Sequence, residues 1–343
     1  MKKFWIAAVL LAGCGKKPGS YEMTSAAESS ASDTLNSQAE EAWAQRNDKA
    51  QLTAALNTYE QLFVADPTNK EIAARLVRGW YFYGDAHEQE LEAKKVAWDK
   101  AITFGQTCLA INADYKAILE KEGKREDAAA ALTKEDVPCT YWYASALGKW
   151  AKESGLATTL KHIGAAKAFI SKVQELDPTF FYGAPHRYWG AYYAGLPSFA
   201  GQDLDRSKKE FETAIEIAPD YLGTRILLAD YWATKNQDQY AIFDEMVQYV
   251  MASDAYALDP ELIPENLAEI EKAKALWAAR SDKFLDAPEA APLKEQPPTK
   301  TEAPAEEAPV EEAPAEEAST EDSETETPAE DTAPTEGSED ASE

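Results

Sequence analysis

Residues 173–178 read Val-Gln-Glu-Leu-Asp-Pro, and related stretches follow at 214–219, Ala-Ile-Glu-Ile-Ala-Pro, and at 255–260, Ala-Tyr-Ala-Leu-Asp-Pro. The three prolines are 41 residues apart, and each has an aliphatic residue two positions before it. Proline suits the first position of a helix, where its missing N–H needs no partner, and Asp177 and Asp259 could cap the helices that follow. A fixed period of this kind predicts stacked helix pairs.

The rest of the chain between residues 35 and 285 has the pattern of amphipathic helices. Apolar residues recur at spacings of three and four, and small residues such as Ala54, Ala101 and Ala214 allow neighbouring helices to pack closely. We therefore predict an all-α, tetratricopeptide-like helical-repeat solenoid of about five antiparallel helix pairs plus a capping helix. An insertion at 114–134 interrupts the period. The expected pairs are Leu35–Arg46 with Lys49–Asp66, Glu71–Gln89 with Glu90–Ile111, Val137–Ser154 with Leu156–Asp177, Gly183–Ala194 with Asp203–Ile217 and Gly223–Thr234 with Gln239–Leu258, and the capping helix is Glu261–Phe284.

The first residues have the parts of an export signal. Two lysines precede a short apolar run, which ends in Leu11-Ala12-Gly13-Cys14. The run is too short to span a bilayer, which takes about 20 residues. The stretch resembles the lipobox of bacterial lipoproteins, which implies a signal peptide at 1–13, lipidation of Cys14 and a membrane anchor outside the cytoplasm. A secretory signal with a chance cysteine is the alternative. Residues 14–34 are expected to be a flexible tether, and Gly15 in place of aspartate favours the outer over the inner membrane.

The charge of the chain is concentrated at its C-terminal end. The 343 residues carry a net charge of −27, and residues 287–343 hold 19 acidic residues and 2 lysines. This stretch repeats Glu-Glu-Ala-Pro and contains almost no large apolar side chains, so it cannot bury enough surface to fold. We predict a disordered acidic tail at 286–343, either a solvated spacer or a contact for cations and basic proteins. The charge argues against nucleic-acid binding.

Little in the sequence indicates catalysis. His87-Glu88 begins like a zinc protease motif, but Leu91 stands where the second histidine would be. The three histidines do not have metal-ligand spacing, so we predict no enzyme, no metal and no cofactor. Cys108 and Cys139 remain as a pair, and in an oxidising compartment they could form a disulfide or stay as two buried thiols.

The stretch between residues 141 and 251 resembles the T-component (TatT) lipoproteins of tripartite ATP-independent periplasmic (TRAP) transporters. The resemblance implies an all-helical tetratricopeptide-like fold and a lipid anchor facing the periplasm. It also implies association with a periplasmic substrate-binding protein, handling of a small hydrophobic ligand and assembly into homo-oligomers. The acidic tail is not part of the family pattern. The residues that carry the resemblance are Tyr141-Trp142-Tyr143-Ala144-Ser145-Ala146-Leu147-Gly148, Leu176-Asp177-Pro178, Ala184-Pro185-His186-Arg187-Tyr188-Trp189-Gly190-Ala191-Tyr192-Tyr193-Ala194-Gly195-Leu196-Pro197, Gly201 and Phe211-Glu212-Thr213-Ala214-Ile215.

Two groups of residues are candidates for binding. The loop at 196–202 is longer than a tetratricopeptide turn needs, and long loops often carry function. The helix before it is rich in aromatic and polar residues that could line a groove. In both groups, packing and closure of the scaffold are the alternative reading, and a general scaffold lipoprotein in envelope assembly is the alternative function. The candidates are Trp142, His186, Arg187, Tyr188, Tyr192, Tyr193, Pro197, Phe199 and Gly201.

Overall fold

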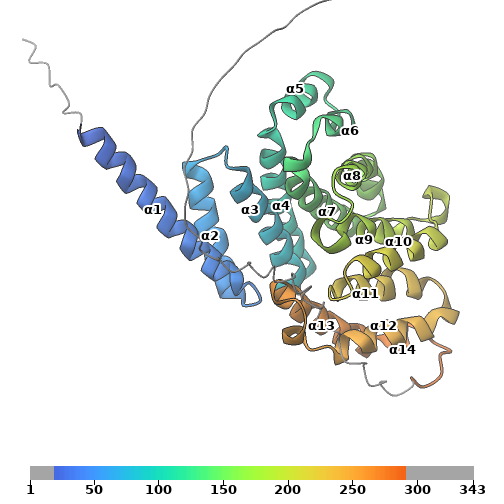
Figure 1. The fold of residues 1–343 in the computed structure, drawn as a ribbon. Coiled ribbons are helices and arrows are strands. Elements are labelled where there is room, and N and C mark those ends of the chain that lie inside the picture. Colours follow the sequence, from blue (N-terminus) through green and yellow to red (C-terminus); the bar gives the residue numbers. More distant parts are fainter. Residues whose placement is uncertain (1–18, 291–343) are drawn as a thin grey trace, which may run out of the picture. The chain divides into compact units, whose positions relative to one another are not determined.

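The computed structural model describes the backbone of residues 19–290 and the side chains of residues 32–290, and every regular element in this part is helical (Figure 1). The all-α prediction is therefore confirmed. The signal peptide, Cys14 and the acidic tail beyond residue 290 lie outside the described residues. No helix in the described part is both long and apolar enough to span a bilayer.

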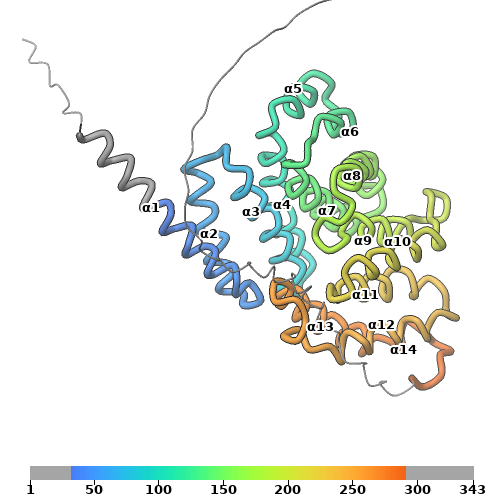
Figure 2. The backbone as a smooth tube through the Cα atoms, viewed as in Figure 1, coloured from blue at the N-terminus to red at the C-terminus, as the bar shows by residue number. Residues whose placement is uncertain are grey.

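The chain forms successive helix pairs from α1 to α10 (Figure 2). Within each pair the two helices pack along their length, and the second helix of one pair contacts the first helix of the next. The helices fall close to the predicted ranges, except that α1 begins at Gly19, inside the range predicted as a tether. The pairs are α1 (Gly19–Ala44) with α2 (Lys49–Ala65), α3 (Lys70–Phe82) with α4 (Leu91–Ala110), α7 (Val137–Glu153) with α8 (Leu156–Leu176) and α9 (Phe180–Gly195) with α10 (Leu204–Ile217).

The C-terminal part is less regular than predicted. The expected helix Gly223–Thr234 is α11 (Gly223–Leu227) followed by a π turn and a 3-10 turn. The helix expected to reach Leu258 is α12 (Tyr240–Ala252), which stops before Asp254 caps a short 3-10 turn. The expected capping helix is divided into α13 (Ile263–Ala278) and α14 (Arg280–Lys283).

The last long helix packs on α12 and also contacts the beginning of the body. Glu265 of α13 binds Arg46 and Arg78, and Lys272 binds Asp85. These partners belong to the first two helix pairs and to the π turn after α3. The last long helix therefore follows α12 in the stack and also reaches the beginning of the body through these ion pairs.

The periodic prolines have different roles. Asp259 caps the 3-10 turn that Pro260 opens, by accepting an N–H at 2.9 Å, as predicted. Pro178 and Pro219 instead lie in turns, two residues and four residues before the next helix begins. Asp177 does not cap that helix but ends α8. The reason is local, because the backbone after Pro178 turns left-handed before α9 becomes regular.

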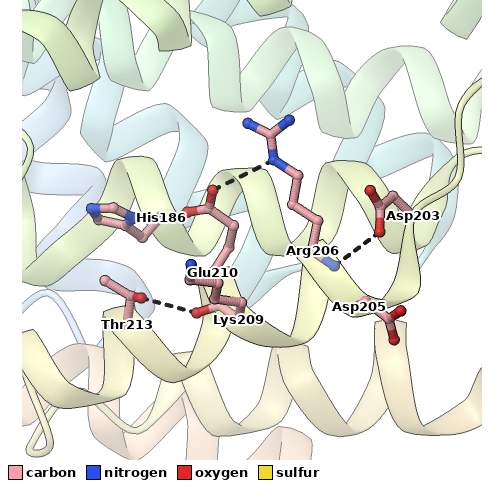
Figure 3. Close-up of a pocket in the computed structure, with 7 residues that line it drawn as sticks. All are labelled: His186, Asp203, Asp205, Arg206, Lys209, Glu210 and Thr213. Atoms are coloured by element: carbon pink, nitrogen blue, oxygen red, sulfur yellow. Dashed lines mark hydrogen bonds and ion pairs between the residues drawn. The ribbon is translucent and has the colours of Figure 1, made fainter.

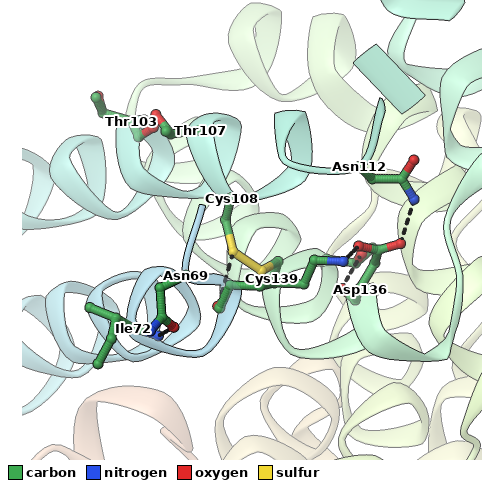
Figure 4. The surroundings of a disulfide bond; sticks show 10 residues. Asn69, Ile72, Thr103, Thr107, Cys108, Asn112, Asp136 and Cys139 are labelled. Atoms are coloured by element: carbon green, nitrogen blue, oxygen red, sulfur yellow. Dashed lines mark hydrogen bonds and ion pairs between the residues drawn. A yellow bond between two sulfur atoms is a disulfide. The ribbon is translucent and has the colours of Figure 1, made fainter. Parts of the chain in front are cut away.

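The insertion that interrupts the period forms α5 (Ala113–Glu122) and α6 (Arg125–Ala128). At its base, Cys108 and Cys139 form a disulfide between α4 and α7, with their Cα atoms 5.9 Å apart (Figure 4). Beside it, the buried carboxylate of Asp136 accepts hydrogen bonds from Lys70 at 2.5 Å and Asn112 at 2.6 Å. The two ends of the insertion are thus fixed to each other and to α3, which explains how the helix stack continues across it.

Reduction of the disulfide tests this account. The two cysteines are 31 positions apart, and the loss of loop closure in the unfolded chain predicts a decrease of about 3–4 kcal/mol in the free energy of unfolding. Urea denaturation with and without a phosphine reductant measures the change. A variant with both cysteines replaced by alanine should not respond to the reductant. Equal free energies of unfolding for the oxidised and reduced chains would contradict the assignment.

Candidate functional site

An aromatic cluster forms where α3, α7, α9 and α11 approach one another. Trp142 is at its centre, with ring centroids 4.8 Å from Phe181, 5.3 Å from Tyr81 and 5.0 Å from Tyr141. Tyr221 continues the cluster, 5.7 Å from Phe181. Most of these rings meet edge to face, which is the favoured geometry for aromatic pairs. We call these five residues the aromatic cluster.

An unusual backbone turn brings Phe181 into this cluster. Phe181, Tyr182 and Gly183 have φ angles of 40°, 60° and 72°, which is the left-handed region. Glycine adopts it freely, but each of the two aromatic residues is disfavoured there by about 1–2 kcal/mol. At Gly183 a side chain would also be crowded, since an added Cβ would lie 3.2 Å from the backbone of Ala214. Tertiary contacts must therefore hold the turn.

Arg187 supplies those contacts. Its guanidinium donates hydrogen bonds to the carbonyl oxygen of Tyr182 at 2.8 Å and to that of Phe181 at 3.1 Å. The same group lies 4.0 Å from the ring centre of Tyr221, a cation–π distance. Arg187 is only 3% exposed. It is a positioning residue that fixes the left-handed turn and orients two members of the aromatic cluster.

A buried ion pair borders the cluster. Glu265 accepts hydrogen bonds from Arg46, at 2.6 and 3.1 Å, and from Arg78, at 2.6 Å. The guanidinium of Arg78 also lies 4.5 Å from the ring centre of Phe181. Burial alone would raise the pKa of Glu265, but the two guanidinium groups outweigh this effect and hold the pKa below its ordinary value. Glu265 is therefore ionised at neutral pH.

A second charged group lies on the same side of α13. The carboxylate of Asp85 binds the ammonium groups of both Lys149 and Lys272, and Lys272 also binds Glu269 at 2.8 Å. Burial would raise the pKa of Asp85, but the two ammonium groups hold it below its ordinary value. The side chain of Lys149 is 27% exposed and that of Lys272 is 29% exposed, so water reaches this group.

A separate surface lies on the other side of α9, against α10 (Figure 3). His186 Nδ1 is 2.7 Å from the carboxylate of Glu210. They line an open recess whose other residues carry both signs of charge. The loop from Pro197 to Gly201 follows, with Gly201 at φ 102° and Phe199 77% exposed. The recess is lined by His186, Asp203, Asp205, Arg206, Lys209, Glu210 and Thr213.

The predicted binding residues divide between these places. Trp142 belongs to the aromatic cluster, and Arg187 contacts it. His186, Pro197, Phe199 and Gly201 belong to the surface on the other side of α9, which we call the α9–α10 face. The remaining three are tyrosines that pack within the scaffold. Tyr188 faces Gly148 of α7, and Tyr192 and Tyr193 surround Trp189 at 5.2 and 5.7 Å, with Arg206 over Tyr193.

Sequence reasoning missed the charged residues around the cluster. Arg78 and Glu265 are 187 positions apart, and each looks like an ordinary surface charge in a helix. It also missed the left-handed turn, because the surrounding pattern is helical. Within the part of the chain with described side chains, no three His, Cys, Asp or Glu residues lie close enough to hold a metal ion.

Replacement of Arg187 by lysine tests its role in the turn. Lysine keeps the charge but cannot donate the two parallel hydrogen bonds of a guanidinium. We expect the free energy of unfolding to fall by about 1–3 kcal/mol, as measured by urea denaturation. Arg206→Lys is the matched control, because Arg206 is exposed over a tyrosine ring, and its effect should stay within about 0.5 kcal/mol. Equal effects of the two substitutions would refute the role.

The ion pair of Glu265 predicts a dependence on pH. A carboxyl whose pKa is lowered by folding stabilises the folded state above its unfolded pKa of about 4.3, and this contribution is lost as the pH falls through the folded pKa. The wild type should therefore lose stability below about pH 4. Glu265→Gln should be less stable at pH 7 and show a shallower loss in acid. Unfolding measured from pH 7 to 3 tests this, with the exposed Glu271→Gln as control. If the Glu265→Gln variant lost as much free energy of unfolding between pH 7 and pH 3 as the wild type does, the prediction would be wrong.

Comparison with known proteins agrees with the architecture. A sequence model of the TRAP transporter T-component family matches residues 48–284. The match runs from the N-cap of α2 to the residue after α14, so it includes the aromatic cluster, the pair of Arg78 with Glu265 and the α9–α10 face, whereas Arg46 lies two residues before it. No curated protein matches the chain. Because the match covers more than half of the 343 residues, the resemblance seen in the sequence is confirmed, and the chain belongs to the TRAP transporter T-component family.

Proposed function

We propose that this chain is a membrane-anchored periplasmic lipoprotein that binds the substrate-binding protein of a TRAP transport system. Membership of the T-component family supports an accessory role in such a system. The family is one of transporter components and is not a class of enzymes. Lipidation at Cys14 would keep the helical body at the membrane surface, where a soluble partner must deliver its cargo. Anchoring raises the local concentration of the binding surface without any new contact.

The α9–α10 face is the part of the body that best suits a protein partner. Phe199 is 77% exposed, which is unusual for a large aromatic side chain. Its loop is nevertheless held in shape, because Pro197 accepts N–H groups from Ala200 at 2.9 Å and from Gln202 at 3.3 Å. A rigid loop displays an aromatic anchor at low entropic cost. This single observation carries the proposal for the partner surface.

The surroundings of Phe199 have the composition of an interface rim. The neighbouring recess contains Asp203, Asp205, Arg206 and Lys209, so both signs of charge are present. Protein interfaces commonly combine aromatic anchors at the centre with a polar rim that fixes orientation. A substrate-binding protein with an apolar pocket and complementary charges would fit this arrangement.

We propose in addition that the chain handles a small hydrophobic ligand at the aromatic cluster, which is buried, with Trp142 and Tyr141 each 6% exposed. Its rings provide apolar faces, while Tyr81, Tyr141 and Tyr221 carry hydroxyl groups at their edges. Ligand sites often combine aromatic walls with a few polar groups in this way. The buried cluster and the exposed α9–α10 face are then two places with two tasks, one for the ligand and one for the partner.

Replacement of Phe199 by serine should weaken partner binding. Removing an aromatic anchor costs about 2 kcal/mol or more, so we expect the dissociation constant to rise by at least about tenfold. The measurement is co-purification and titration with the TRAP substrate-binding protein of the same organism. Val64→Ser is the matched control, since Val64 is 80% exposed on α2, away from this face. If both variants bind alike, the surface is wrong; if the wild type recovers no substrate-binding protein, the function is wrong.

A further inference from the structure

One ammonium group next to the aromatic cluster has hydrogen-bonding capacity that the fold does not use. Lys149 of α7 binds the carboxylate of Asp85, which is its one hydrogen-bond acceptor within the described part of the chain. An ammonium group has three N–H donors, so two of them remain for another acceptor. The side chain is 27% exposed, so water or a ligand can reach these donors.

The charge and the position of this ammonium group are both fixed. Desolvation acts to lower the pKa of Lys149, but the carboxylate of Asp85 outweighs it and holds the pKa well above its ordinary value. Asp85 also binds Lys272, which in turn binds Glu269 at 2.8 Å. Lys149 is therefore a cation at neutral pH, held by a carboxylate that it shares with a second lysine. A fixed cation with spare donors suits an anionic oxygen.

Two buried polar side chains beside Lys149 have no hydrogen-bond partner among the residues with described side chains. Ser145 lies one turn earlier on the same face of α7, and it is 6% exposed with an unpaired hydroxyl. The indole N–H of Trp98 is also unpaired, and Trp98 is 3% exposed with its ring centre 5.9 Å from Lys149 Nζ. Buried polar groups are nearly always hydrogen-bonded, so each exception needs an explanation. A ligand that supplies acceptors next to Lys149 would provide one.

The backbone at this place is irregular on two sides. Asp85 lies in the π turn Tyr83–His87. Tyr231 lies in a second π turn, Leu228–Trp232, and its hydroxyl accepts a hydrogen bond at 2.9 Å from Lys152, one turn further along α7. Single π turns in helical proteins are frequent at functional sites. Both π turns of the described helices thus contact the lysines of α7.

The same place borders the aromatic cluster. The ring centre of Tyr81 is 5.9 Å from Lys149 Nζ and 5.3 Å from the ring centre of Trp142. Trp142, Ser145 and Lys149 follow one another on one face of α7, at spacings of three and four residues. A molecule with an acidic group at Lys149 would therefore have its apolar part against Tyr81.

We propose that Lys149, with Ser145 and Trp98 beside it, binds the carboxylate of a small amphiphilic acid whose apolar part contacts Tyr81. The charges favour a single negative charge on the ligand, because Asp85 and Glu269 repel a dianionic phosphate more strongly than a carboxylate. This inference rests on the proposed handling of a small ligand and names the chemical class of that ligand.

Calorimetric titration tests the site in the full chain with Cys14→Ser, which carries no lipid and needs no detergent. The probes are octanoate and 1-octanol, which have the same number of carbon atoms and differ in charge. Octanoate should bind the unmodified site more tightly than 1-octanol. Lys149→Met should raise the dissociation constant for octanoate by about tenfold or more and leave that for 1-octanol unchanged. Octyl phosphate should bind more weakly than octanoate, and tighter binding of octyl phosphate would overturn the assignment of a carboxylate.

Two further variants keep the outcome decisive. Ser145→Ala removes a hydroxyl that has no partner, so it should not lower the free energy of unfolding, yet it should weaken octanoate binding by about threefold or more. Lys274→Met removes a lysine of α13 that pairs locally with Glu271, and it should bind octanoate as the unmodified chain does.

The site and the proposed ligand handling fail in different ways. Unchanged octanoate affinity in Ser145→Ala and in a folded Lys149→Met variant overturns the carboxylate site, and continued binding of 1-octanol then shows that an uncharged ligand is still handled. If neither octanoate nor 1-octanol binds the unmodified chain, both the site and the handling of a small ligand are overturned.

Discussion

The contact of Glu265 with Arg46 and Arg78 is the constraint on which the rest of the structure depends. A row of helix pairs in which each pair touches only its neighbours would remain open at both ends. One carboxylate shared by two guanidinium groups instead attaches the last long helix to the first two pairs. The buried carboxylate needs both cations, since an unpaired buried charge is strongly unfavourable. This requirement fixes where α13 must lie.

The position of α13 in turn depends on the left-handed turn before α9. A regular helix through Phe181 and Tyr182 would point their rings elsewhere and start α9 in another direction. Arg187 holds the turn through two backbone carbonyls and the ring of Tyr221. Local strain is thus balanced by tertiary contacts, as is common where a fold positions functional groups. The aromatic cluster exists because of this balance.

Helix α9 lies between the aromatic cluster and the α9–α10 face. Its Arg187 side faces the aromatic cluster, and its His186 side faces α10 and the recess. Both places lie within the stretch that matches the TRAP transporter T-component family, and one helix positions both.

The sequence by itself determined the helices, because their apolar spacing and capping residues act over a few positions. The Asp259 cap and the helix pairs around the insertion are examples, and the residues of the family resemblance are likewise contiguous. Only the tertiary structure decided how the chain closes. Arg46 and Glu265 are 219 positions apart, and charges in an amphipathic helix look solvated until another segment covers them. It also decided the turn at Phe181 and Tyr182, since two aromatic residues favour a right-handed backbone unless other contacts stabilise the left-handed one. Here these contacts come from Arg78, far away in the sequence, and from Arg187, which is itself held over the ring of Tyr221.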